Sequence, residues 1–167
     1  SALTTTATGL SPYAALWSQV RHQYLIRKED IVAAGITPTG PIGFTALSFY
    51  IASIPIGSGC QGFTIRMKNT TATDAYGFDD TGLMQVFGPV SMVPSMVTTT
   101  GWLKHEFNTP FMWDGASNVL VDVCHDNGNS SWSSTWDIRY GTPTVAGTTY
   151  RYCYEYDDYM TGVMCSV

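Results

Sequence analysis

The stretch from residue 110 to residue 124, Pro-Phe-Met-Trp-Asp-Gly-Ala-Ser-Asn-Val-Leu-Val-Asp-Val-Cys, constrains the fold more than any other part of the chain. Val119, Val121 and Val123 fall on one face of an extended run, and Asp122 falls on the other. This period of two residues is typical of a half-buried β-strand. The Asp-Gly pair supplies a turn before the strand, and the Phe and Trp that precede it are expected to fill the core at its entrance. The pattern predicts a central strand of a β-sandwich.

Similar short runs recur along the chain, separated by turn residues, and only residues 28–35 favour a helix, with acids in its first turn and a glycine at its end. The other expected strands are 20–26, 44–52, 62–68, 83–87, 101–107, 135–140, 148–156 and 162–167. Nine or ten short strands at regular spacing indicate an all-β fold. We predict an antiparallel β-sandwich of Ig-like or jelly-roll type with one short helix and an extended N-terminal strand.

The composition limits the partners that this protein can have. Charged residues make up 13% of the 167 residues, against roughly 25% in typical soluble domains, and Ser and Thr are abundant instead. The formal net charge is −5 and the eight Lys and Arg are scattered, so the chain has no basic patch for nucleic acid. No apolar run approaches the roughly 18 residues that span a membrane. Solubility would come from hydroxyl groups, from attached glycan or from burial in an assembly.

Four cysteines, Cys60, Cys124, Cys153 and Cys165, show no metal-binding spacing. An even number in a Ser/Thr-rich chain favours two disulfides and a secreted, extracellular location. Three pairings are open. The interpretation that we favour joins Cys153 to Cys165 as a local clip and Cys60 to Cys124 across the two sheets.

The N-terminal residues 1–10 form an uncharged extension to a single domain that spans residues 11–167. Leu3, Thr5 and Ala7 lie on one face of the extension if it is extended. Such a strand has to pair with something, either within its own domain or at the sheet edge of a neighbouring molecule. The three residues are therefore candidate contacts of a donor strand.

Tyrosines alternate along the run 148–156, with polar residues between them: Tyr150, Tyr152, Tyr154 and Tyr156. They are consistent with an aromatic ladder over the core. They are also consistent with a subunit interface or a surface that stacks on sugars, since Tyr offers a wide amphipathic contact at low entropy cost. Trp17 is a further candidate for such an interface.

No catalytic, metal or cofactor motif is present, so we predict that the protein is not an enzyme and carries no cofactor. The three histidines are far apart in the sequence, and His105, between Lys104 and Glu106, is expected to be a polar surface or partly buried residue. The acidic clusters at 79–80, 126–129 and 157–158 are expected to be solvated turn residues.

Several positions fit glycosylation patterns. Asn69 and Asn129 each begin an Asn-x-Ser/Thr triplet, and Thr98, Thr99 and Thr100 form a run that suits O-linked glycan. An attached glycan coat would explain the solubility of a chain with so few charges.

The order of several motifs resembles secreted Ig-like β-sandwich modules from surface proteins of Bacteroidota-type bacteria. The motifs span residues 23–26, 29–35, 42–49, 62–68 and 110–121. The resemblance implies an Ig-like sandwich on a cell surface and no catalytic signature. A free-standing sandwich with a strand-like N-terminal extension also resembles a subunit of a bacterial fibre or pilus built by donor-strand exchange.

Two functions follow as hypotheses. The first is a structural subunit that joins copies of itself head to tail into an extracellular filament, with residues 1–9 as the donor strand. The alternative is a secreted carbohydrate-binding or adhesin module, in which Trp102, Trp132 or Trp136 stacks on sugar rings.

Overall fold

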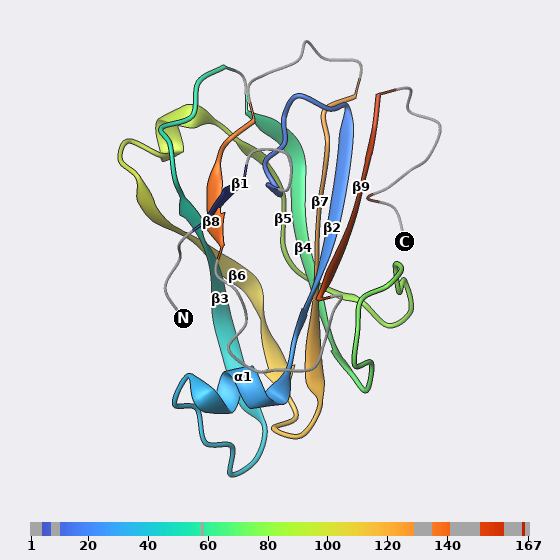
Figure 1. Ribbon diagram of the computed structural model, residues 1–167. Helices are drawn as coiled ribbons and strands as arrows, with labels where there is room; N and C mark the ends of the chain where they lie inside the picture. The colour runs from blue at the N-terminus through green and yellow to red at the C-terminus, as the bar shows by residue number, and fades with distance from the viewer. Residues whose placement is uncertain are drawn as a thin grey trace.

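A computed structural model describes residues 5–7, 11–57, 59–128, 135–140, 151–158 and 165, and for residues 5–7 and 140 it describes the backbone alone. Within these residues the chain forms two antiparallel β-sheets packed face to face (Figure 1). This confirms the predicted all-β sandwich. The predicted strands 148–156 and 162–167 lie partly outside the described residues.

Sheet A has the strand order β1-β8-β3-β6 and sheet B has the order β5-β4-β7-β2-β9. The strands of sheet A are β1 (Thr5–Ala7), β8 (Ile138–Tyr140), β3 (Ile42–Ile51) and β6 (Gly101–Trp113). The strands of sheet B are β5 (Met84–Met92), β4 (Cys60–Thr70), β7 (Asn118–Asp126), β2 (Gln19–Ile26) and β9 (Tyr152–Asp157). From β5 onward, the chain crosses to the other sheet at every step.

The predicted central strand is β7, which pairs with β4 on one side and β2 on the other. Val119, Val121 and Val123 are buried in the core, as are Phe111 and Trp113 at the end of β6. The opposite face of β7 differs from the prediction, because Asp122 is also fully buried. Residues 78–80 and Cys165 contact the side chains around it, so β7 is covered on both faces.

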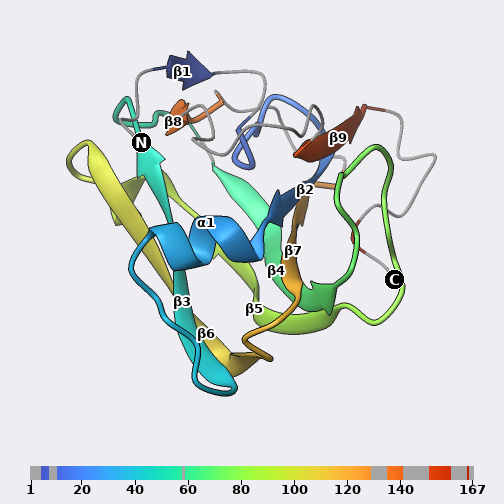
Figure 2. The same cartoon turned by 60° about the horizontal axis from the view of Figure 1, so that its bottom comes forward.

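The predicted helix is α1 (Lys28–Ala33), a short element that follows β2. The Asp30 carboxylate accepts a hydrogen bond from the Arg27 backbone N–H at 3.2 Å, and Gly35 ends the helix with φ of +95°. Ile31 packs into the core. Figure 2 shows α1 lying across one end of the space between the two sheets.

Two loops connect the sheets at the other end of the sandwich. One runs from Ile51 of β3 to Cys60 of β4, and the other, which contains the 3-10 turn η1 (Pro94–Met96), runs from Met92 of β5 to Gly101 of β6. Ile51 pairs with Gly101 and Cys60 pairs with Met92, so both loops begin and end side by side. We call this part of the molecule the crossover end.

One side of the sandwich is closed by β5 and β6. The Gly88 backbone N–H of β5 donates to Asn108 Oδ1 of β6 at 3.2 Å. Gly88 has φ of +84°, and a Cβ at this position would lie 2.2 Å from the carbonyl oxygen of Phe63. Only glycine satisfies both conditions without moving the backbone.

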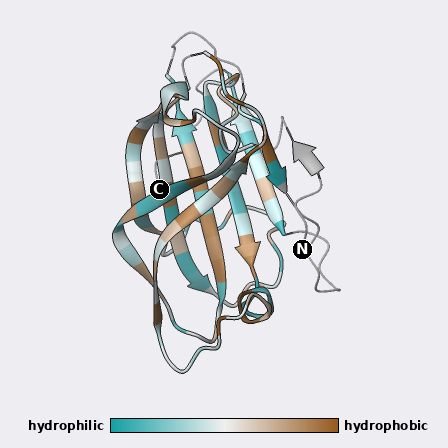
Figure 3. Ribbon diagram, turned by 90° about the vertical axis from the view of Figure 1, so that its left-hand side faces the viewer, coloured by the Kyte–Doolittle hydropathy of each residue, from teal (hydrophilic) through white to brown (hydrophobic). Residues whose placement is uncertain are grey.

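The core lies between the sheets and extends under the segment that precedes β2. Hydrophobic and hydrophilic bands alternate along the strands, as expected when one face of each strand is buried (Figure 3). In the segment before β2, Tyr13 is fully buried, and its ring stacks on those of Phe63 and Trp136 at 5.0 and 5.3 Å.

Candidate functional site

The N-terminal strand β1 forms the outer edge of sheet A by pairing with β8. Thr5 is paired with Tyr140, Thr6 with Arg139 and Ala7 with Ile138. In the described part of the chain, β8 in turn pairs with β3 at Tyr50 and Ile51. The described contact between β1 and β8 therefore consists of three residue pairs on a short strand, at the margin of the sheet. Leu3, which was predicted to share the donor face with Thr5 and Ala7, lies outside the described residues.

This geometry sets what β1 can do. An edge strand is held mainly by main-chain hydrogen bonds, which any strand in the same register can replace. Ile138, the partner of Ala7, is part of the core, so the position next to β8 is continuous with the hydrophobic interior. The edge is a site at which a strand of this chain, or the same strand of another copy, can be seated.

A second feature is a row of aromatic rings along β9, the edge strand of sheet B. Tyr152, Tyr154 and Tyr156 are each a little over 40% exposed, and adjacent rings are nearly parallel at 6.0–6.1 Å. Trp17 stacks on Tyr156 at 4.1 Å, and the Tyr154 ring lies 5.7 Å from the buried His22 ring. The row is partly a ladder over the core and partly exposed surface. Tyr150 lies outside the described residues.

The three histidines are all buried in the core near the segment 11–14. The Tyr13 hydroxyl and His105 Nε2 are hydrogen-bonded at 2.5 Å, and His22 and His125 face the backbone of Ser11 and Ala14. Burial, with a smaller contribution from the neighbouring His125, lowers the pKa of His22 to about 3. Burial also lowers the pKa values of His105 and His125 to about 4. All three side chains are neutral at pH 7.

His105 was predicted to be a surface or partly buried residue and is almost fully buried. Lys104 and Glu106 point outward from β6 and form an ion pair at 2.7 Å, so the residue between them points inward. The Tyr13 hydroxyl provides the hydrogen bond that a polar group needs in the core. No local pattern in the sequence identifies that partner, which is 92 residues away.

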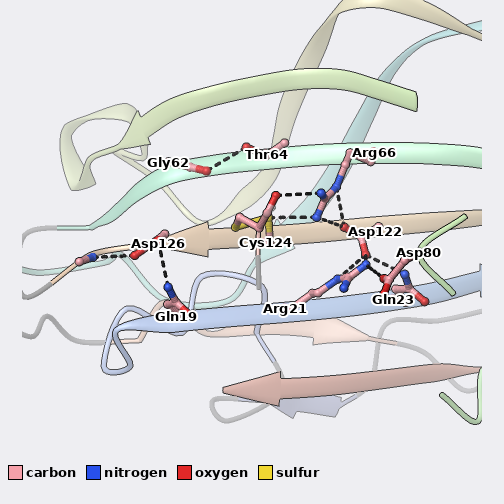
Figure 4. Close-up of a disulfide and its surroundings, with 12 residues drawn as sticks. Gln19, Arg21, Gln23, Gly62, Thr64, Arg66, Asp80, Asp122, Cys124 and Asp126 are labelled. Carbon is pink, nitrogen blue, oxygen red and sulfur yellow. Dashed lines mark hydrogen bonds and ion pairs between the residues drawn. A yellow bond between two sulfur atoms is a disulfide. The ribbon is translucent and has the colours of Figure 1, made fainter. Parts of the chain in front are cut away.

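A charged network is buried on the outer face of sheet B, and sequence reasoning missed it (Figure 4). Asp122 Oδ2 accepts hydrogen bonds from Arg21 Nε at 2.7 Å and Gln23 Nε2 at 2.8 Å. Asp122 Oδ1 accepts from Arg66 Nε at 3.0 Å and Nη2 at 2.7 Å. Arg21 also pairs with the partly exposed Asp80 at 2.6 Å, so two cations face two anions.

The charges of this network support one another. Burial lowers the pKa of Arg21, but the carboxylates of Asp122 and Asp80 together raise it above its ordinary value. The Phe78 ring covers the guanidinium of Arg21 at 4.7 Å. Because every member of the network is paired, we assign it a structural role. Asp80, predicted to be a solvated turn residue, is more than half exposed and also forms an ion pair with Arg21.

The disulfide joins Cys124 to Cys165, and both predicted pairings are wrong. Cys60 faces the core on β4, four residues from Thr64, the partner of Cys124, which puts the two cysteines about 13 Å apart along the strands. Cys165 lies over β7, two strands from Cys153 on β9, and its carbonyl accepts a hydrogen bond from Arg66. Cys60 and Cys153 are free thiols.

The other predicted sites are distributed over the surface. Asn69 is exposed at the end of β4, where its Nδ2 donates to the carbonyl oxygen of Met112 at 3.0 Å, and residues 98–100 are exposed next to η1. Asn129 and Trp132 lie outside the described residues. Trp136 is fully buried and is not available for stacking on a sugar, whereas Trp102 is exposed.

The part of the chain that the structure describes contains no group of three or more His, Cys, Asp or Glu side chains placed to hold a metal ion. It also contains no helix that is long and apolar enough to cross a membrane. No protein-family model, curated protein or solved structure matches the chain significantly. The resemblance to bacterial surface modules remains a prediction from motif order.

Proposed function

We propose that this protein is a structural subunit of an extracellular bacterial fibre, in which the N-terminal strand of one copy pairs with β8 of the next. The observation that carries the proposal is the position of β1 at the edge of sheet A, where three residue pairs attach it to β8 within the described residues. So small a contact is weak within one chain, and the same register can form between two chains. The Cys124–Cys165 disulfide fits an oxidising, extracellular location.

The exchange joins two different surfaces, a donor strand and the β8 edge. A contact between different surfaces propagates into an open chain unless two copies exchange strands with each other. The row formed by Trp17, Tyr152, Tyr154 and Tyr156 is available for secondary contacts between subunits in the fibre, because Tyr and Trp are enriched in such interfaces. These partners are further copies of the same chain.

Electron microscopy and sedimentation of a variant that cannot pair along β1 test this function. In Thr5→Pro/Thr6→Pro, at least one of the two residues loses an N–H that faces β8, because alternate N–H groups of an edge strand point toward its neighbour. We expect at least a tenfold loss of polymer, with an unchanged far-UV circular dichroism spectrum. A chain lacking residues 1–10 should behave in the same way.

Thr5→Val/Thr6→Val is the matched control, since valine keeps the N–H groups and favours strands. It should polymerise like the unmodified protein. If the proline variant forms as much polymer as the unmodified protein, β1 is not the contact between subunits. An unmodified protein that is only a monomer or a closed dimer would contradict the fibre.

A further inference from the structure

The crossover end carries an unusual share of the exposed apolar surface. Seven large apolar side chains in the described residues are more than half exposed. Five of them lie at this end, and we call them the crossover patch: Leu16 (52%), Ile54 (56%), Ile56 (69%), Met96 (52%) and Trp102 (63%). Leu16 belongs to the segment that leads into β2, and the other four lie in the two crossover loops or at the start of β6. Exposed apolar side chains gathered in one region mark an interaction surface.

The segments that carry most of the patch contain no charged residue. None of the 8 Lys and Arg or 13 Asp and Glu of the chain lies in 11–18, 52–59 or 93–100. Charges enter this end from the neighbouring residues 137–139, where Asp137 Oδ2 accepts a hydrogen bond from Ser53 Oγ at 3.0 Å and Arg139 lies over the Tyr50 ring. The opposite end, by contrast, has Lys28, Glu29 and Asp30 in α1. Depletion of charge together with exposed Trp and Met is the composition of an interface core. The N-terminal residues 1–10 are uncharged as well.

Trp102 is held in position by its neighbours across sheet A. The Trp102 ring packs edge to face against the Tyr50 ring, with their centroids 5.5 Å apart. The guanidinium of Arg139 lies over the same Tyr50 ring, 5.5 Å from its centroid. The register continues from Arg139 to Thr6 of β1. Trp, Tyr and Arg are the residue types that dominate binding energy at interfaces. The exposed indole is therefore in line with the strand that we propose to exchange.

The short chain between β1 and the rest of the domain limits how far a donor subunit can lie from the crossover patch of the copy that holds its N-terminal strand. Ala7 and Ser11 are four residues apart, so their Cα atoms are at most about 14 Å from each other. Ser11 is fully buried in its own domain, next to Tyr13, whose carbonyl oxygen accepts a hydrogen bond from the Trp136 backbone N–H. Ala7 pairs with Ile138, which adds about 5 Å between opposed Cα atoms. An arm bound to β8 of another copy therefore brings Ser11 of the donor within about 20 Å of Ile138, the residue of β8 that pairs with Ile51 at the crossover end.

We infer that the crossover patch is the surface on which a second copy of this chain packs when its N-terminal strand is exchanged. The inference rests on the proposed function and adds the orientation of the subunits. Because Ser11 of the donor lies at its own crossover end, the crossover ends of successive subunits meet along the fibre. Their α1 ends point away from these contacts. A typical specific interface buries roughly 800 Å² on each partner, more than the three described pairs of β1 residues supply.

Charge substitutions within and outside the patch test this inference. Trp102→Asp and Ile56→Asp place a charge in the contact, and each should reduce sedimenting polymer at least tenfold while leaving the urea midpoint unchanged. Met112→Asp is the control, because Met112 is exposed on the same strand as Trp102 but ten residues, about 33 Å, away. It should polymerise like the unmodified protein. Intact mass equal to 18.2 kDa confirms that no glycan on residues 98–100 masks the patch.

The outcomes separate this inference from the fibre itself. If the unmodified protein and all three variants polymerise equally, the fibre stands and the crossover patch is not its contact. If soluble polysaccharides quench the fluorescence of Trp102, measured against Trp102→Phe, and Trp102→Asp still polymerises, the patch binds sugar and the inference is overturned. If the unmodified protein does not polymerise at all, the proposed function is wrong, and the inference that rests on it is wrong as well.

Discussion

Lowering the pH from 7 to 5 is expected to destabilise the folded protein by about 6 kcal/mol, because three buried histidines each contribute about 2 kcal/mol. The pKa values of His22, His105 and His125 are about 3, 4 and 4 in the folded protein, whereas an unfolded chain has values near 6.5. Between pH 4 and pH 6.5 the unfolded state therefore binds more protons than the folded state. Stability is lost as the pH falls from about 6.5 toward 4 and is constant above about 7.

The groups around the histidines cannot offset this loss. His105 faces Tyr13 and the rings of Phe49, Phe63 and Phe87. His22 faces Tyr24, Tyr154 and His125, and a charge on either histidine disfavours a charge on the other. Asp126 is the one carboxylate with an effect on His125, and that effect is smaller than the effect of burial.

Urea unfolding between pH 7.5 and pH 5 measures the loss. The slope of the unfolding free energy against pH should correspond to the uptake of nearly three protons at pH 5. In His22→Gln the slope should correspond to the uptake of nearly two protons. Any effect of this substitution on the free energy of unfolding above pH 7 should not depend on pH. A free energy of unfolding that is flat from pH 7.5 to pH 5 would contradict the burial of neutral histidines.

The second large effect is expected from Asp122→Asn, which should cost about 3–5 kcal/mol of stability. Asparagine keeps the shape of the side chain but removes the charge that faces Arg21 and Arg66, both nearly fully buried. It also replaces one acceptor oxygen by a donor, so several of the hydrogen bonds to the carboxylate are lost. The guanidinium groups would then be buried with Asp80 as their one remaining anion within the described network.

Asp80→Asn is the matched control, since the Asp80 side chain is more than half exposed and pairs with Arg21 at the surface. Exposed ion pairs contribute about 0–1 kcal/mol, so this variant should unfold at nearly the same urea concentration as the unmodified protein. Equal losses in the two variants would contradict the assignment of Asp122 as the buried centre of the network.

The positions of the strands could be predicted because alternation in a strand is local. The predicted runs 20–26, 62–68 and 118–124 became β2, β4 and β7 with small shifts at their ends. The helix was predicted from its acidic first turn and Gly35. The burial of Asp122 could not be predicted, because a charged residue in an alternating run reads as a surface position. Its partners come from β2 and β4, and no local pattern links them.

The candidate site was predictable in part. The uncharged extension and its tendency to form a strand were visible in residues 1–9, but its partner β8 is more than 130 residues away along the chain. The disulfide could not be predicted, because a pairing of cysteines depends on which strands are neighbours. The crossover patch was not predicted as a surface, because Ile54, Met96 and Trp102 are far apart in sequence and come to one end of the sandwich only through the connections between the two sheets.

Pairing of the N-terminal strand with β8 of another copy can be trapped by a disulfide between the cysteines of a Thr6→Cys/Arg139→Cys variant in a Cys153→Ser background. Opposed residues of antiparallel strands have Cα atoms about 4.5–5.5 Å apart, which suits a disulfide. We expect a ladder of covalent dimers, trimers and larger species on a non-reducing gel, which collapses to the monomer on reduction. A cross-linked monomer alone, or a dimer with nothing larger, would contradict the proposed fibre.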